Sequence, residues 1–74
     1  MIMIKFAERL KELREERGMK KVFLAKKLHV TPNSVCQWER GHCRPDYETL
    51  AVLAEIFFTT TDYLIGATDE RNRK

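Results

Sequence analysis

The sequence has 74 residues and a formal net charge of +3, with 43% hydrophobic and 34% charged residues. This length allows one domain, and the share of core-forming residues is too high for a disordered chain. No apolar run approaches the roughly 20 residues that span a bilayer. We therefore expect a soluble, cytoplasmic domain that folds alone.

Positive charge is concentrated in the middle of the chain. Between Met19 and Pro45 the only acidic residue is Glu39, whereas the basic residues are Lys20, Lys21, Lys26, Lys27, Arg40 and Arg44. Such a block is typical of a surface that binds a polyanion, although a solvated lysine-rich surface would have the same composition. Charge alone does not separate these two interpretations.

The first two predicted elements are short amphipathic helices. An apolar stripe at helical spacing predicts a helix over residues 5–17 that ends at Gly18, with an inward side made of Phe6, Leu10 and Leu13. A second helix is expected over residues 21–28, followed by a turn at His29 and Val30. Its inward side is made of Leu24, Ala25 and Leu28.

The pair Thr31-Pro32 predicts the start of a third helix, because threonine caps free amides and proline suits the first helical position. This helix is expected to run to about Arg40 and to end at Gly41. A helical wheel places Val35 and Trp38 on an inward side. The outward side carries Asn33, Cys36, Gln37 and Arg40.

That outward side has the residue types that read bases. Asn33 and Gln37 can each form two hydrogen bonds with an adenine edge in the major groove, and Arg40 can reach a guanine or a phosphate. An ordinary solvated helix face would more often carry Glu and Lys. Four residues alone leave both interpretations open.

The rest of the chain predicts two more helices and a tail. Asp46 is expected to cap a fourth helix, whose inward residues would be Tyr47, Leu50, Leu53, Ala54 and Phe57. Threonines 59–61 end that helix and cap a short fifth one, which closes at Gly66. Residues 67–74 are polar and are expected to be flexible. The predicted organisation is one all-α domain over residues 1–66 with a tail over residues 67–74.

The two cysteines, Cys36 and Cys43, are expected to be free thiols, because small domains that depend on disulfides usually carry four or more cysteines. Together with His42 they match no familiar zinc spacing, so no metal site is predicted. The sequence contains no cofactor motif, glycine-rich phosphate loop or catalytic constellation, which argues against an enzyme.

Several segments together resemble the phage repressor/Cro-type helix-turn-helix family, also called the xenobiotic-response-element family. They are FAERLKELR at 6–14, LAKKL at 24–28, VCQWERG at 35–41 and PDYETL at 45–50, and the ending TDYLIG at 61–66 is similar to that of many short members. The likeness covers residues 5–66 in order and without gaps. It implies a compact five-helix bundle of the lambda-repressor-like type, in which helices two and three form the helix-turn-helix and helix three lies in the major groove.

The resemblance also implies roles for individual residues. The base-proximal positions would be Pro32, Asn33, Ser34, Cys36 and Gln37. Contacts with the phosphate backbone are implied for Lys21, Arg40, the Gly41 amide and Arg44. Arg14 and Glu39 match a pair that forms a buried salt bridge in relatives and ties helix one to helix three.

Three positions depart from the pattern of the family. Lys20-Lys21 replace a frequent Ser-Gln pair, which removes a capping hydroxyl and adds positive charge. His29 replaces the usual glycine of the turn and is expected to approach a positive φ, which histidine tolerates. Phe58 stands where relatives often have Gly or Asn, and it is either an anchor for a partner chain or a locally packed residue.

By this resemblance we expect a sequence-specific transcription regulator, foremost a repressor, that binds a pseudo-palindromic operator in double-stranded DNA as a homodimer. The apolar segments considered for the dimer contact are Met1 to Ile4 and Phe58 to Ile65. No cofactor, membrane association or small-molecule effector domain is expected. The alternative is a protein-interaction module, such as an antitoxin that masks a toxin and binds DNA only for autoregulation.

Overall fold

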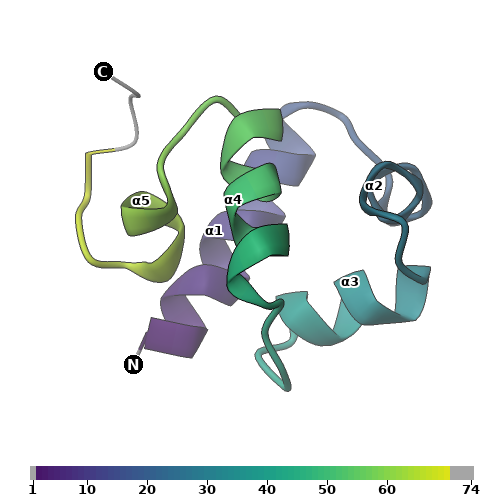
Figure 1. Ribbon diagram of the computed structural model, residues 1–74, viewed down its shortest axis with the longest axis horizontal. Helices are drawn as coiled ribbons and strands as arrows, with labels where there is room; N and C mark the ends of the chain where they lie inside the picture. The colour runs from purple at the N-terminus through teal and green to yellow at the C-terminus, as the bar shows by residue number, and fades with distance from the viewer. Residues whose placement is uncertain (1, 71–74) are drawn as a thin grey trace.

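The computed structural model describes residues 2–70, with side chains from residue 5 onward, and this part of the chain is a bundle of five α-helices (Figure 1). The helices are α1 (Ile2–Glu16), α2 (Lys21–Leu28), α3 (Pro32–Glu39), α4 (Tyr47–Ile56) and α5 (Thr61–Ile65). The prediction of an all-α, five-helix fold is confirmed. None of these helices is both long and apolar enough to cross a bilayer.

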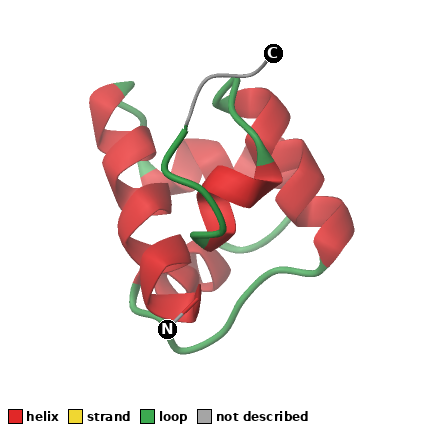
Figure 2. Cartoon of the chain, turned by 90° about the vertical axis from the view of Figure 1, so that its left-hand side faces the viewer, coloured by secondary structure: helices red, strands yellow, loops and turns green. Residues whose placement is uncertain are grey.

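The five helices surround one core. In Figure 1, α4 lies in front of α1 at the centre, α2 and α3 lie on one side, and α5 lies on the opposite side. Contacts join α2 to α3, α1 to both α3 and α5, and α4 to α5. Figure 2 looks at the α5 side and shows the segment after α5 running across it. The side of the molecule that carries α3 is therefore remote from α5.

Every helix contributes at least one completely buried apolar side chain to the core. These side chains, all 0% exposed, are Leu10, Leu24, Val35, Leu53 and Leu64. Burying a side chain of this size stabilises a fold by about 1.5–3 kcal/mol relative to leaving it in water. Since each short helix holds such an anchor, the bundle fixes the position of all five helices, α3 included.

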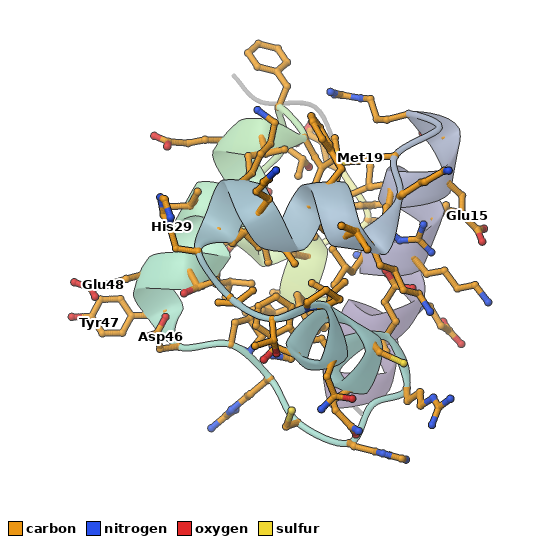
Figure 3. All side chains as sticks on the ribbon, turned by 90° about the vertical axis from the view of Figure 1, so that its right-hand side faces the viewer. Glu15, Met19, His29, Asp46, Tyr47 and Glu48 are labelled. Carbon is orange, nitrogen blue, oxygen red and sulfur yellow. The ribbon has the colours of Figure 1, made fainter. Side chains whose placement is uncertain are left out.

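Two features of the helices differ from the sequence predictions. Helix α1 begins at Ile2, earlier than the predicted start at residue 5. The prediction that Tyr47 turns inward is wrong, because this side chain is 82% exposed and projects away from the body of the molecule (Figure 3). Tyr47 is the first residue of α4, and no neighbouring helix extends over it.

All five helices of the described residues end in the same backbone arrangement. Just after each helix one residue has a positive φ and its N–H donates to the carbonyl three residues earlier, while the next N–H donates to the carbonyl five residues earlier. This pair of hydrogen bonds defines the Schellman motif. The positive-φ residues are Gly18, His29, Gly41, Phe58 and Gly66. The expectation of a positive φ at His29 is confirmed, with a value of 59°.

The segment after α5 is held by one arginine of α1. The Arg9 guanidinium donates to the carbonyl oxygens of Tyr63 and Thr68, at 2.5 and 2.6 Å, and pairs with the Asp69 carboxylate at 2.5 Å. Its central carbon also lies 4.1 Å from the centre of the Tyr63 ring, within the range of a cation–π contact. Flexibility of the tail over residues 67–74 stays a prediction, and in its described part these bonds fasten Thr68 and Asp69 to α1.

Candidate nucleic-acid interface

Helix α3 is held in the bundle by its inner side, and a side-chain cap defines its start. At the start, the Thr31 hydroxyl accepts a hydrogen bond from the Ser34 backbone N–H at 3.2 Å, with Pro32 in the first turn as predicted. Val35 and Trp38 are buried in the core, at 0% and 6% exposure. The opposite side of the helix consequently faces away from the bundle.

The residues expected near the bases differ in exposure. Pro32 and Asn33 are exposed, whereas Ser34, Cys36 and Gln37 are half-buried. The Ser34 hydroxyl lies 3.1 Å from the Thr31 hydroxyl, so one of them donates to the other. Of the two amide side chains, Asn33 is thus the more exposed on this face, and Gln37 follows it one helical turn later.

The Gln37 side chain has a partner that sequence reasoning missed. The Nδ1 atom of the His42 ring lies 2.8 Å from Oε1 of Gln37. Gln37 lies in the last turn of α3, and His42 lies in the loop that follows the helix. The spacing of five residues across a helix-ending glycine is the sequence signal that could have found this contact.

The basic residues expected at the phosphate backbone lie at the two ends of the segment formed by α2 and α3. Lys21 is the first residue of α2 and is half-buried, while Arg40 and Arg44 are exposed beyond the end of α3. Lys20, at the N-cap of α2, makes no side-chain capping bond, in keeping with the loss of the family's hydroxyl. Positive charge therefore lies at both ends of the helix-turn-helix.

The Gly41 amide does not fit the role that the resemblance implies. Its N–H donates to the carbonyl of Trp38 at 3.1 Å, as part of the motif that ends α3. This donor is already used within the fold, which argues against a phosphate contact by the Gly41 amide. With a φ of 78°, Gly41 instead supplies the left-handed conformation that turns the chain toward Arg44.

Arg14 and Glu39 form the ion pair that joins α1 to α3. The Arg14 Nε atom lies 2.6 Å from one Glu39 carboxylate oxygen, and Nη2 lies 3.0 Å from the other. The ion pair is therefore bidentate. Arg14 also donates to the Met19 carbonyl at 2.8 Å, which fixes the loop before α2. The hydrogen bond with Glu39 raises the pKa of Arg14, whereas its burial acts in the opposite direction.

Both thiols are free, with Cys36 half-buried on α3 and Cys43 exposed in the loop. Among the described residues, no group of three or more His, Cys, Asp or Glu side chains is arranged to hold a metal ion.

The arrangement of α2, the turn at His29 and α3 is that of a helix-turn-helix. A family model described as Helix-turn-helix matches residues 10–64. The chain therefore belongs to the helix-turn-helix family, and the resemblance noted in the sequence is confirmed.

Curated relatives of this chain are bacterial regulators. It is 37% identical over 67 residues to the HTH-type transcriptional regulator ImmR of Bacillus subtilis (strain 168), covering 90% of this chain and 52% of that protein. The HTH-type transcriptional regulator AnsR of the same strain is 37% identical over 59 residues, covering 80% of this chain and 51% of that protein. The chain thus spans about half the length of these two relatives.

Solved structures with a similar fold include an enzyme. Hydroxypropylphosphonic acid epoxidase from S. wedmorenis superposes with a TM-score of 0.76 and 33% sequence identity, covering 84% of this chain and 33% of that one. The crystal structure of FeII HppE gives a TM-score of 0.80 at 32% identity, covering 88% of this chain and 34% of that one. The matched region is about a third of each of those chains.

Proposed function

We propose that this chain is a sequence-specific regulator of transcription that binds double-stranded DNA with α3 in the major groove, and that it represses by occupying an operator. The observation that carries the proposal is the placement of α3, which is held by Val35 and Trp38 on one side and presents Asn33 and Gln37 on the other. Its membership of the helix-turn-helix family supports the same function.

The proposal divides the exposed residues into two groups. The base-reading group comprises Pro32, Asn33, Ser34, Cys36 and Gln37, with specificity resting on the two amides, since proline has no N–H to donate. The phosphate-binding group comprises Lys21, Arg40 and Arg44, which fix the register of the protein on the duplex without reading sequence.

We further propose that the chain binds a pseudo-palindromic site as a homodimer, with half-sites about one helical turn apart. Of the two apolar segments considered for the contact, Met1 lies outside the described residues, as do the side chains of residues 2–4. In the second segment Tyr63 and Leu64 are buried, whereas Phe58 is 67% exposed. Phe58 is therefore the exposed large apolar residue of this segment and the one proposed for contact with a second copy.

A protein-interaction module is the second candidate function. It is favoured by two exposed apolar side chains on α2, Val22 at 62% and Phe23 at 50% exposure. An enzymatic role is not proposed, because the likeness to the epoxidase covers about a third of that chain and the curated relatives named above are regulators. Since repressors act on DNA, the proposed location is the cytoplasm.

The test is a selection of the purified protein against random duplex DNA, followed by binding measurements at two salt concentrations. We expect a palindromic site to be enriched. The Asn33→Ala variant should lose discrimination between bases by about 1–3 kcal/mol, because its bonds go to a base edge. The Lys21→Ala variant should bind all duplexes more weakly and with a smaller salt dependence, because its bond goes to phosphate.

Lys11→Ala is the matched control, since Lys11 is an exposed lysine on α1, outside the helix-turn-helix. It should bind the selected duplex as the unaltered protein does. Enrichment of no site, with equally weak binding to every duplex, would contradict the DNA-reading function and favour a protein partner for α2.

A further inference from the structure

The contact between Gln37 and His42 places a titratable side chain on a residue proposed to read bases. The distance of 2.8 Å between His42 Nδ1 and Gln37 Oε1 is that of a direct hydrogen bond. His42 is exposed and Gln37 is half-buried, so the pair lies at the edge of the proposed groove-facing surface. The inference drawn from this pair rests on the proposed function, in which α3 occupies the major groove.

The backbone at the end of α3 holds His42 in this position. The His42 backbone N–H donates to the Gln37 carbonyl at 3.0 Å, while the Gly41 N–H donates to Trp38. These are the two bonds of the Schellman motif, which depends on the positive φ of Gly41. One residue, His42, is thus bonded to Gln37 through both its backbone and its side chain.

The direction of the side-chain bond determines what Gln37 offers to DNA. An amide oxygen only accepts hydrogen bonds, so this contact takes the His42 tautomer whose proton is on Nδ1, and Nδ1 then donates to Gln37. This bond uses one of the two lone pairs of the Gln37 oxygen and holds that oxygen toward His42, so the N–H groups at Nε2 are the part of the amide left to face the groove. Guanine presents two acceptors on its major-groove edge, whereas the two-bond pairing of Gln with adenine also requires the amide oxygen to face the base.

We propose that His42 is a positioning residue that fixes the orientation of the Gln37 amide and thereby makes Gln37 a hydrogen-bond donor that favours guanine over adenine at its base pair. Without the imidazole, the amide is free to rotate and to pair with adenine through both its oxygen and its nitrogen. His42 sets specificity through Gln37 and does not itself read a base.

The simplest competing role for His42 is a phosphate contact beside Arg40 and Arg44. A phosphate contact contributes equally to binding of every sequence and does not depend on Gln37. A double-mutant cycle separates these two roles, because only a positioning role makes the effects of the two substitutions depend on each other.

The experiment compares the unaltered protein, His42→Ala, Gln37→Ala and the double variant. The binding of each protein is measured to the selected duplex and to the duplexes that carry each of the other base pairs at the position contacted by Gln37. His42→Ala keeps the backbone N–H, so the end of α3 is retained. We expect the unaltered protein to favour guanine over adenine about tenfold and His42→Ala to lose most of this preference. In the Gln37→Ala background the His42 substitution should leave base preference unchanged.

Two further variants complete the design. His42→Asn keeps a donor close to the position of Nδ1 and should restore part of the guanine preference. Cys43→Ala changes the adjacent exposed residue of the loop and should leave base preference as it is. Thermal unfolding followed by circular dichroism checks that each variant is folded.

The outcomes of this experiment are distinguishable. If His42→Ala weakens binding to all four duplexes by the same factor, with or without Gln37, the positioning role is overturned and the proposed function stands. A preference of the unaltered protein for adenine at this pair would also overturn it. If the selection enriches a site but the duplexes that differ at this pair bind the unaltered protein equally, this inference alone fails. If the selection enriches no site and every duplex binds equally, both the proposed function and this inference fail.

Discussion

Glu39 is the acidic residue on which the attachment of α3 to α1 depends. Its side chain is only 4% exposed, and both of its carboxylate oxygens face the Arg14 guanidinium. Removing one partner from a buried ion pair leaves the other charge without compensation, and this cost exceeds the net value of the pair itself. The pair therefore enforces the position of α3 more than it adds to stability.

We expect Glu39→Gln to lower the free energy of unfolding by about 3 kcal/mol, measured by urea denaturation, because Arg14 would keep its charge without a buried anion. Glu15→Gln is the matched control. The Glu15 carboxylate lies 3.9 Å from the same guanidinium but is 58% exposed, so its loss should cost at most about 0.5 kcal/mol. Equal effects of the two substitutions would contradict the structural role of Glu39.

At the scale of single elements, side chains at helix starts and left-handed residues at helix ends set the bounds of α3, α4 and α5. Thr31, Asp46 and Thr60 each accept a hydrogen bond from a backbone N–H in the first turn of their helix. Such caps satisfy amides that have no partner within the helix. The start of α4 follows the loop that carries Arg44, so the Asp46 cap also determines where that loop ends.

The Asp46 cap gives stability a pH dependence of defined sign. Hydrogen bonds from Thr49, through its side chain and its backbone N–H, lower the pKa of Asp46 from the ordinary value of 3.8. A carboxylate with a lowered pKa in the folded state stabilises the fold above its unfolded pKa, and this contribution is lost as the pH falls through the folded value. We expect the unaltered protein to lose stability relative to Asp46→Asn as the pH falls from 3.8, the ordinary pKa, through the lowered pKa of the folded state.

Urea denaturation of both proteins at pH 5 and pH 3 provides the measurement for this prediction. Asn accepts the same capping bond without a charge, so Asp46→Asn is itself the neutral reference. A difference in stability that stays constant between the two pH values would show that the Asp46 charge contributes nothing.

At the scale of the whole molecule, Phe58 combines an unfavourable backbone conformation with exposure to solvent. Its φ of 53° lies in the left-handed region, which costs a residue with a side chain about 1–2 kcal/mol. The side chain is 67% exposed, so local packing does not offset this cost within one chain. Of the two alternatives for Phe58, this exposure favours an anchor for a partner chain.

We expect Phe58→Gly to raise the free energy of unfolding of the monomer by about 1 kcal/mol and to weaken self-association, because glycine relieves the left-handed strain but removes the proposed contact. Sedimentation equilibrium and urea denaturation measure the two effects. His29→Gly is the matched control, since His29 has a φ of 59° at the end of α2. The His29→Gly variant should gain stability and self-associate as the unaltered protein does. If Phe58→Gly also self-associates as the unaltered protein does, Phe58 is not part of the interface.

The fold could be read from the sequence largely because its signals are local. Thr31-Pro32 and Asp46 mark helix starts, and α2 agrees with the helix predicted over about residues 21–28 because an apolar stripe lies between two turn signals. Tyr47 was placed on the wrong side because a helical pattern does not reveal which part of the first turn is covered by a neighbour. Arg9 was missed because arginine is usually exposed, and its burial depends on carbonyl groups more than 50 residues away in the chain.

The candidate site was predictable as a set of residues but not as a set of contacts. The outward side of the third helix follows from helical geometry alone, and the structure places Asn33 and Gln37 on it. The bond between Gln37 and His42 and the use of the Gly41 amide both depend on how the chain turns after α3. The spacing around Gly41 indicates that the chain turns there, but it does not show which donors and acceptors the turn brings together.

The fastening of Thr68 and Asp69 by Arg9 has a practical consequence for handling the protein. These residues follow α5, which lies on the opposite side of the bundle from α3 (Figure 1). A fluorescent label or an immobilisation tether joined beyond them would start from a fixed point remote from the recognition surface. Chains captured on a sensor chip through this tether would present α3 to the solution. Association and dissociation rates measured on the chip would then describe binding to the α3 side without obstruction by the surface.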